Sequence, residues 1–181
     1  MKAEFEELVT EIQKIAKKAF LDLFANGETY YYCTLITTGE AHFPHVTAWS
    51  LEALAEVMEE DYPDDDVLEI KWLYAESPYM AWKYEEYFEN SPFYFGGIPY
   101  ELTDEDYNKE YDFRLSAMEE AMKRLDEEGI FALNQPRCEV YVNVETVDPD
   151  DSDFERLLRL NNRADLKKLL KGTLWGDRLN K

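Results

Sequence analysis

Cysteine is scarce in this sequence. Its 181 residues include two cysteines, Cys33 and Cys138, together with seven glycines and seven prolines. So few thiols exclude a disulfide framework, and the fold must be stabilised by burying apolar side chains. The composition allows this, because 45% of the residues are hydrophobic and 15% are aromatic. We expect a single domain spanning residues 1–181, in which both thiols are reduced and buried.

Long apolar runs are also missing. No stretch approaches the roughly 20 apolar residues that cross a bilayer as a helix. The opening segment MKAEFEELVT carries acidic residues directly after Met1, whereas a signal peptide begins with basic residues followed by an apolar run. We therefore expect a cytoplasmic protein that has no membrane partner.

Basic residues are outnumbered by acidic ones. The chain has 19 Lys and Arg against 40 Asp and Glu, which gives a formal net charge of −21. Such a surface repels nucleic-acid phosphates, so we expect no nucleic-acid partner, and it attracts basic proteins. The charge is unevenly distributed, because residues 154–181 carry a net +5 and the first 153 residues carry −26. The predicted partner is a basic protein.

Apolar side chains recur every three or four residues in two long segments, which predicts helices over residues 5–23 and 103–127. Gly27 and Gly129 follow these segments as helix stops. Three further helical segments are predicted over residues 51–60 with Ser50 as the cap, over residues 77–90 beginning at Ser77-Pro78, and over residues 148–171, which contain the basic C-terminal helical segment from about residue 154.

Four segments are rich in aromatic and β-branched residues or alternate between apolar and polar side chains. They predict strands over residues 28–39, 41–49, 67–74 and 140–145. Pro44 limits the second of these to a sheet edge or a break. The runs at 61–66 and 91–102 are predicted loops. The sequence thus predicts an α+β domain with a mainly antiparallel sheet of about four strands packed with several helices.

His42 and His45 form an HxxH unit. Two imidazoles need at least one further ligand to hold a catalytic metal, and no recognisable spacing supplies one. Pro44 also prevents a regular helix that would place both rings on one face. The two histidines are therefore weak metal candidates, and the sequence predicts no catalytic residue and no cofactor.

Aromatic rings are interleaved with acidic side chains between residues 79 and 89. Rings attract cations through their faces, and carboxylates form directed hydrogen bonds with Arg and Lys, so this combination suits an interface with a basic partner. Packing of the rings in the core is the alternative. The predicted partner-binding residues are Tyr79, Trp82, Tyr84, Glu85, Glu86 and Glu89, with Asp64, Asp65 and Asp66 of the acidic loop.

Three stretches resemble a known family: YYYCTLITTG with the following TAWSLEAL, KWLYAESPYMAWKYE, and AMEEAMKRLDEEGIFALNQPRCEVYVNVETVDPD. The family is an uncharacterised bacterial domain of unknown function, placed among candidate immunity proteins of polymorphic toxin systems. Its pattern SP-x-x-x-W-x-Y-E is present over residues 77–85, and its EG-x-F corner over residues 128–131, although Ala132 stands where the family often has glycine. The resemblance implies a cognate toxin as the partner and no catalytic residues.

Three functional hypotheses follow. The leading one is a non-enzymatic, acidic protein-binding domain that neutralises a toxin as an immunity protein. The second is a small metal-dependent hydrolase that uses His42, His45 and nearby carboxylates. The third is a housekeeping or regulatory domain whose acidity maintains solubility. The sequence leaves the oligomeric state open.

Overall fold

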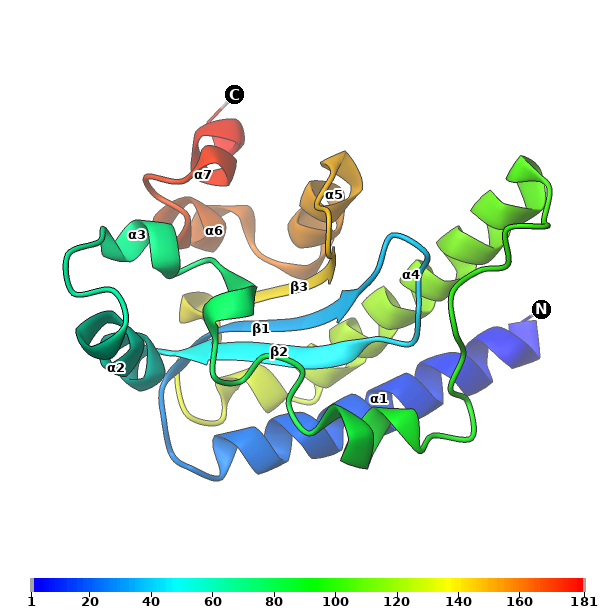
Figure 1. Cartoon of the computed structure of the whole chain (residues 1–181), viewed down its shortest axis with the longest axis horizontal. Helices are drawn as coiled ribbons and strands as arrows, with labels where there is room; N and C mark the ends of the chain where they lie inside the picture. The colour runs from blue at the N-terminus through cyan, green and yellow to red at the C-terminus, as the bar shows by residue number, and fades with distance from the viewer. Residues whose placement is uncertain (1, 181) are drawn as a thin grey trace.

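Three strands pair in the order β2–β1–β3, and helices lie on both faces of this sheet (Figure 1). The computed structural model describes residues 2–180. Its strands are β1 (Tyr30–Thr37), β2 (His45–Ser50) and β3 (Tyr141–Thr146). The predicted α+β class is confirmed, but the sheet has three strands where about four were expected.

The sheet is mixed. β1 pairs with β2 as an antiparallel hairpin and with β3 in parallel, with Tyr32 beside Tyr141 in the register. All eight residues of β1 are buried, as expected for the central strand. The second pairing is parallel because β1 and β3 are joined by a long connection. After β2 the chain runs through residues 51–103 and returns along α4 (Asp104–Glu127) before it enters β3.

Two long helices cover the first face of the sheet. α1 (Lys2–Phe24) and α4 (Asp104–Glu127) pack side by side on aliphatic side chains of the strands (Figure 1). The predicted stop is confirmed, because Gly129 has a φ of 78° just after α4, and the Thr103 hydroxyl caps the start of α4 by accepting a hydrogen bond from the Asp106 N–H. These local signals explain why both helices could be expected from the sequence.

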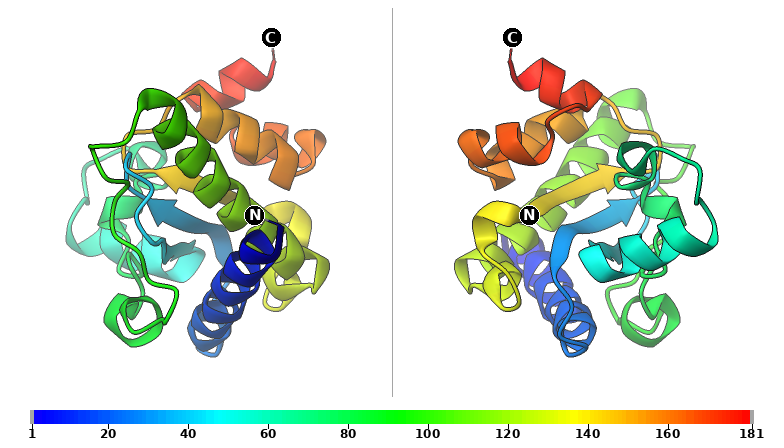
Figure 2. Two further views of the ribbon diagram at one scale, coloured as in Figure 1. Left: turned by 90° about the vertical axis from the view of Figure 1, so that its right-hand side faces the viewer. Right: turned by 90° about the vertical axis from the view of Figure 1, so that its left-hand side faces the viewer.

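Shorter elements cover the second face, as the two side views show (Figure 2). The chain reaches this face twice, once between α1 and α4 and again after β3. These elements are α2 (Leu51–Glu60), α3 (Val67–Ile70), η1 (Tyr74–Glu76), α5 (Asp151–Leu160), α6 (Arg163–Leu169) and α7 (Leu174–Leu179). The remaining turns are η2 (Glu85–Glu89), η3 (Ile130–Ala132) and η4 (Arg137–Glu139).

The predicted strand over residues 67–74 is wrong. This segment forms α3, a turn and the start of η1, and it lies over the sheet instead of joining it. The Asp66 carboxylate caps α3 by accepting the Leu68 N–H, and the Lys71 carbonyl accepts the Tyr31 hydroxyl at 2.7 Å. The alternation of apolar residues reflects burial of Ile70 and packing of Trp72 against the second face, which mimics a strand pattern.

The predicted helix over residues 77–90 is also largely absent. Its first half runs along the outer edge of β2, where the Ser77 hydroxyl donates to the Ala48 carbonyl at 2.5 Å and the Trp82 N–H donates to the Val46 carbonyl at 2.9 Å. An edge strand offers unpaired backbone groups, and this segment satisfies some of them. Only residues 85–89 turn helically, as η2.

The two cysteines differ in environment. Cys33 is buried in β1, whereas Cys138 is exposed in η4, so the expectation that both thiols are buried is wrong for Cys138. Both thiols are free. Within residues 2–180, no helix has the length and apolar character needed to cross a membrane.

Candidate functional site

The aromatic rings at the start of the acidic–aromatic segment attach it to α1 and to the hairpin. The Trp82 indole N–H donates to the Asp22 carboxylate at 2.9 Å, and the Tyr79 hydroxyl donates to the Glu28 carboxylate at 2.7 Å. Burial, followed by the Glu28 carboxylate, raises the pKa of Tyr79 to about 12. Tyr79 and Trp82 pack against the core at partly buried positions, so these two rings serve mainly as anchors.

The carboxylates that follow are free. Glu85, Glu86 and Glu89 are exposed, and no hydrogen bond or ion pair within residues 2–180 occupies their side chains. Lys83, the lysine within this segment, is held by the Asp22 carboxylate at 2.7 Å, and Lys18 of α1 lies over the Tyr87 ring with its Nζ atom 5.9 Å from the ring centroid. The negative charge of the three glutamates is therefore available to a partner.

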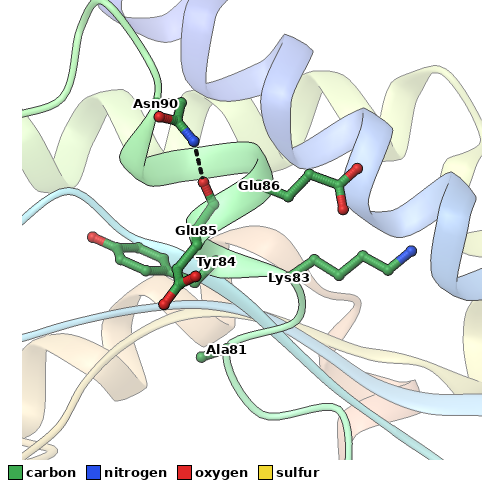
Figure 3. A pocket seen from close by; sticks show the side chains of 6 residues that line it. All are labelled: Ala81, Lys83, Tyr84, Glu85, Glu86 and Asn90. Atoms are coloured by element: carbon green, nitrogen blue, oxygen red, sulfur yellow. Dashed lines mark hydrogen bonds between the residues drawn. The ribbon is translucent and has the colours of Figure 1, made fainter.

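A shallow, open cavity of about 640 Å³ lies at this segment (Figure 3). The Tyr84 ring and the Glu85 carboxylate lie together on one side of it, while the Lys83 side chain extends toward α1. Ala81 and Lys83 hold left-handed backbone conformations, with φ of 48° and 44°. Such values are unusual for residues other than glycine, and the surrounding edge contacts hold the segment in this shape.

A second shallow cavity, of about 300 Å³, lies between α1 and the loop that follows η2. It is lined by Glu6, Glu7, Thr10, Glu11 and Phe93. We name the surface along α1 and residues 84–93 the acidic seam and define it by Glu7, Glu11, Tyr84, Glu85, Glu86, Glu89 and Phe93. Carboxylates and two aromatic rings thus line two shallow cavities, one at η2 and one between α1 and the loop that follows η2.

The predicted binding residues do not form one site. Asp64, Asp65 and Asp66 lie in the loop between α2 and α3, at one end of the molecule, whereas η2 lies alongside α1 (Figure 1). The three aspartates are exposed. They form a second acidic surface that is separate from the seam.

The histidine pair lacks further metal ligands. The Nδ1 atom of His42 lies 2.6 Å from the Thr38 hydroxyl, and that of His45 lies 3.1 Å from the Thr47 hydroxyl. Burial lowers the pKa of His45 to about 4, so its ring is neutral at physiological pH. In the described part of the chain, no three His, Cys, Asp or Glu side chains are grouped to share a metal ion.

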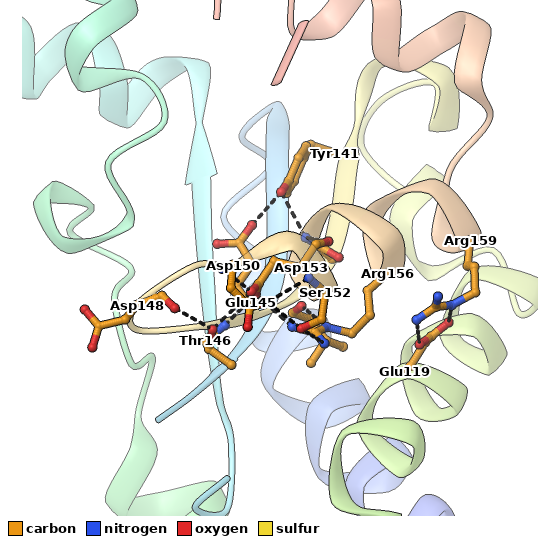
Figure 4. Close-up of polar contacts among 12 residues, drawn as sticks. Glu119, Tyr141, Glu145, Thr146, Asp148, Asp150, Ser152, Asp153, Arg156 and Arg159 are labelled. Carbon is orange, nitrogen blue, oxygen red and sulfur yellow. Dashed lines mark hydrogen bonds and ion pairs between the residues drawn. The ribbon is translucent and has the colours of Figure 1, made fainter. Parts of the chain in front are cut away.

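Sequence reasoning missed a buried polar cluster on the second face (Figure 4). The Glu145 carboxylate accepts hydrogen bonds from the hydroxyls of Tyr32 at 2.7 Å and Tyr141 at 2.6 Å. Burial raises the pKa of Glu145 above its usual value. Nearby, Asp153 accepts the Thr146 N–H at 2.8 Å and pairs with Arg156 at 2.9 Å.

This cluster joins β3 to α5, and its residues line neither of the two cavities described above, so we assign it a structural role. The alternation of residues 140–145 correctly separated two faces of β3. Both the apolar and the polar residues of β3 are buried, although alternation usually indicates one face in contact with water. A glutamate that directly follows Val144 in a strand of alternating valines was the one available signal.

No curated protein and no solved structure matches the chain. The family model described as "Domain of unknown function (DUF4303)" matches residues 12–162. This range contains all three strands, the helices α2 to α5 and most of α1, and it ends just before α6. The chain therefore belongs to the DUF4303 family of domains of unknown function.

Proposed function

We propose that this protein is a non-enzymatic binding protein whose acidic seam receives a basic partner protein. The observation that carries the proposal is the arrangement at η2. Three exposed carboxylates that have no hydrogen-bond or ion-pair partner within residues 2–180 stand beside an aromatic ring and a shallow cavity, while Lys83 is neutralised by Asp22. This combination suits the side chains of Arg and Lys.

The support beneath the seam favours binding over a purely solubilising role. Trp82, Lys83 and Tyr79 fasten the segment to Asp22 and Glu28, so η2 is held in place before any partner arrives. A surface that is already ordered loses less conformational entropy on binding. The free carboxylates would accelerate encounter with a basic protein, and Tyr84 and Phe93 would supply contact area.

The partner that we infer is a toxin, and the protein would act as its immunity protein. A nuclease toxin fits this chemistry best, because its active site must attract phosphate and therefore presents positive charge. The acidic seam would bind at this positively charged active site and block it. The resemblance to candidate immunity proteins supports this part of the proposal.

The test begins with co-expression of the protein and each basic product of a neighbouring gene, with rescue of growth as the readout. Binding of the purified pair is then measured over a salt series. Replacing Glu85, Glu86 and Glu89 by lysine should lower the association rate on the order of tenfold or more, because steering by charge is lost. The matched control replaces Glu56, Glu59 and Glu60 by lysine, since these exposed glutamates on α2 carry the same charge far from the seam.

Equal losses in the two variants would show that net charge matters and that the seam does not. Tight binding that ignores salt would contradict the electrostatic part of the proposal. No observed arrangement of residues favours the hydrolase hypothesis, because His42 and His45 are not joined by further metal ligands within residues 2–180. The housekeeping hypothesis stays a prediction, and it requires that reversing charges in the seam leaves cellular function intact.

A further inference from the structure

A second surface of the molecule lies where α3 meets the turn between α6 and α7. A Cβ atom on Gly172 would lie 3.4 Å from the Leu68 Cδ1 atom, so the two segments are in contact. Leu174 begins α7 two residues later and has 87% of its surface exposed, more than any other large apolar residue of the described chain. Val67 and Leu68 of α3 are 45% and 42% exposed. Three large aliphatic side chains are therefore in water within a short stretch of surface.

This apolar surface is bordered by charges of both signs. On one side, Asp64 and Asp65 stand in the loop that leads into α3. On the other side, Lys167 and Lys171 are one helical turn apart on α6 and at its end, and both are exposed. None of these four side chains takes part in an ion pair or side-chain hydrogen bond within residues 2–180. Unpaired charges of both signs therefore stand on the two segments that meet at Leu68 and Gly172.

The opposite side of α6 explains why the lysines point outward. Leu166 and Leu170 are buried against the second face of the sheet, and Trp175 of α7 stacks on Tyr141 with ring centroids 6.3 Å apart. The segment from α6 to α7 is thus attached to the sheet through apolar contacts, and no acidic side chain within residues 2–180 pairs with Lys167 or Lys171. Arg178 is the exception, because it pairs with Asp151 at 2.7 Å.

We propose that this surface, which we name the mixed-charge patch and define by Asp64, Asp65, Val67, Leu68, Lys167, Lys171 and Leu174, is a two-fold interface between two copies of this chain. A two-fold axis through the aliphatic centre places the acidic loop of each copy against the lysines of the other. The patch is therefore complementary to itself in both charge and apolar character.

The net charge of −21 does not prevent this pairing. At physiological ionic strength the Debye length is about 8 Å, so charges across an interface act mainly through the groups in contact. Exposed ion pairs contribute little free energy, and Leu174 with its aliphatic neighbours supplies most of the affinity. The charges set the orientation of the two copies. This interface is independent of the acidic seam, which lies along α1.

The experiment uses the full chain, with sedimentation velocity over a micromolar concentration series. The natural protein should form a dimer in a concentration-dependent manner. Leu174→Glu should weaken the dimer on the order of tenfold or more, because a charge would enter the apolar centre. The residue is 87% exposed, so thermal unfolding of the variant should match that of the natural protein. Replacing Glu85, Glu86 and Glu89 by lysine is the control and should leave the dimer intact.

The second experiment reverses the charges of the patch, one sign at a time. Variant one carries Asp64→Lys and Asp65→Lys, and variant two carries Lys167→Glu and Lys171→Glu. Each variant alone would face like charges across the two-fold axis and should stay monomeric, whereas an equimolar mixture should form a heterodimer. A natural protein that stays monomeric throughout, a dimer indifferent to Leu174→Glu, or variants that pair equally well alone and mixed would overturn the proposal. A monomeric result would leave the test of the acidic seam unaffected.

Discussion

The two faces of the sheet are stabilised in different ways. The first face is aliphatic, with Cys33, Leu35, Val142 and Val144 packed under the long helices α1 and α4. The second face combines aromatic rings with buried polar groups, and short helices and turns cover it. An aliphatic face accepts any helix with a suitable apolar stripe, because dispersion and burial have little direction.

Buried polar groups impose direction. On the second face the Trp49 indole N–H donates to the Leu73 carbonyl at 3.0 Å, and the Arg156 guanidinium donates to the Val144 carbonyl at 2.9 Å. Each such bond fixes one covering segment relative to the sheet. The comparison indicates that the first face contributes mainly through burial, whereas the second face determines where irregular segments lie.

The largest effect is expected on the first face. Phe20 of α1 is fully buried and meets Phe131 edge-on, with ring centroids 5.2 Å apart. Phe20→Ala should lower the free energy of unfolding by about 4 kcal/mol, because it removes a buried ring and leaves a cavity. Urea unfolding measures this loss, and Phe20→Leu should lose clearly less. A loss below about 1 kcal/mol would mean that α1 contributes little to the core.

The next effect tests the directed bonds of the second face. Asp153→Ala leaves the buried Arg156 guanidinium without its ion-pair partner and the Thr146 N–H without its acceptor. We expect the free energy of unfolding to fall by about 3 kcal/mol. Asp151→Ala is the matched control, since its pair with Arg178 is exposed and should contribute less than about 1 kcal/mol. Equal losses in the two variants would remove the distinction between buried and exposed pairs.

Two helix caps, the buried Ser50 and the exposed Thr103, should show a smaller difference in unfolding free energy. Ser50 is buried, accepts the Ala53 N–H at 2.9 Å and donates to the Glu28 carboxylate at 2.5 Å, whereas Thr103 caps α4 at an exposed position. Ser50→Ala should cost about 1 kcal/mol or somewhat more in unfolding free energy, and Thr103→Ala should cost less. Thermal unfolding of the two variants gives the comparison. A larger loss of unfolding free energy in Thr103→Ala than in Ser50→Ala would contradict the expected ranking of the buried and the exposed cap.

The smallest change is expected at Glu145, and it should appear as a dependence on pH. Burial holds the folded-state pKa of Glu145 above its usual value of 4.5, although the hydroxyls of Tyr32 and Tyr141 partly oppose this rise. The native state therefore retains a proton that the unfolded state releases, so stability contributed at low pH is lost as pH rises from 4.5 through the folded pKa.

Glu145→Gln should remove this loss because glutamine is neutral at every pH. The difference in unfolding free energy between Glu145→Gln and the natural protein should therefore shift in favour of the variant as pH rises from 4.5 toward neutrality. Denaturant unfolding at several pH values measures it. A difference that is constant with pH would show that Glu145 is ionised alike in both states.

Several elements could be predicted because their signals are local. The apolar stripes of α1 and α4, the Ser50 cap and the stop at Gly129 depend on residues within a few positions of one another, and all are present. The central position of β1 also followed from its buried, aromatic sequence. Among the predicted binding residues, the glutamates of η2 are exposed beside Tyr84, whereas Tyr79 and Trp82 anchor the segment, and the role of these residues in binding stays a prediction.

The sequence by itself determined the acidic character of the protein, its α+β class, the two long helices and the strands that line the core, because composition and short-range periodicity control these properties. Only the tertiary structure decided that residues 67–74 cover the sheet, that residues 77–84 follow the edge of β2 and that Asp64–Asp66 lie away from the seam. The physical reason is that an alternating or mixed pattern fits a strand, an edge segment or a covering turn equally well. The free backbone groups of β2 and the polar partners of the second face, which are distant in sequence, selected among them.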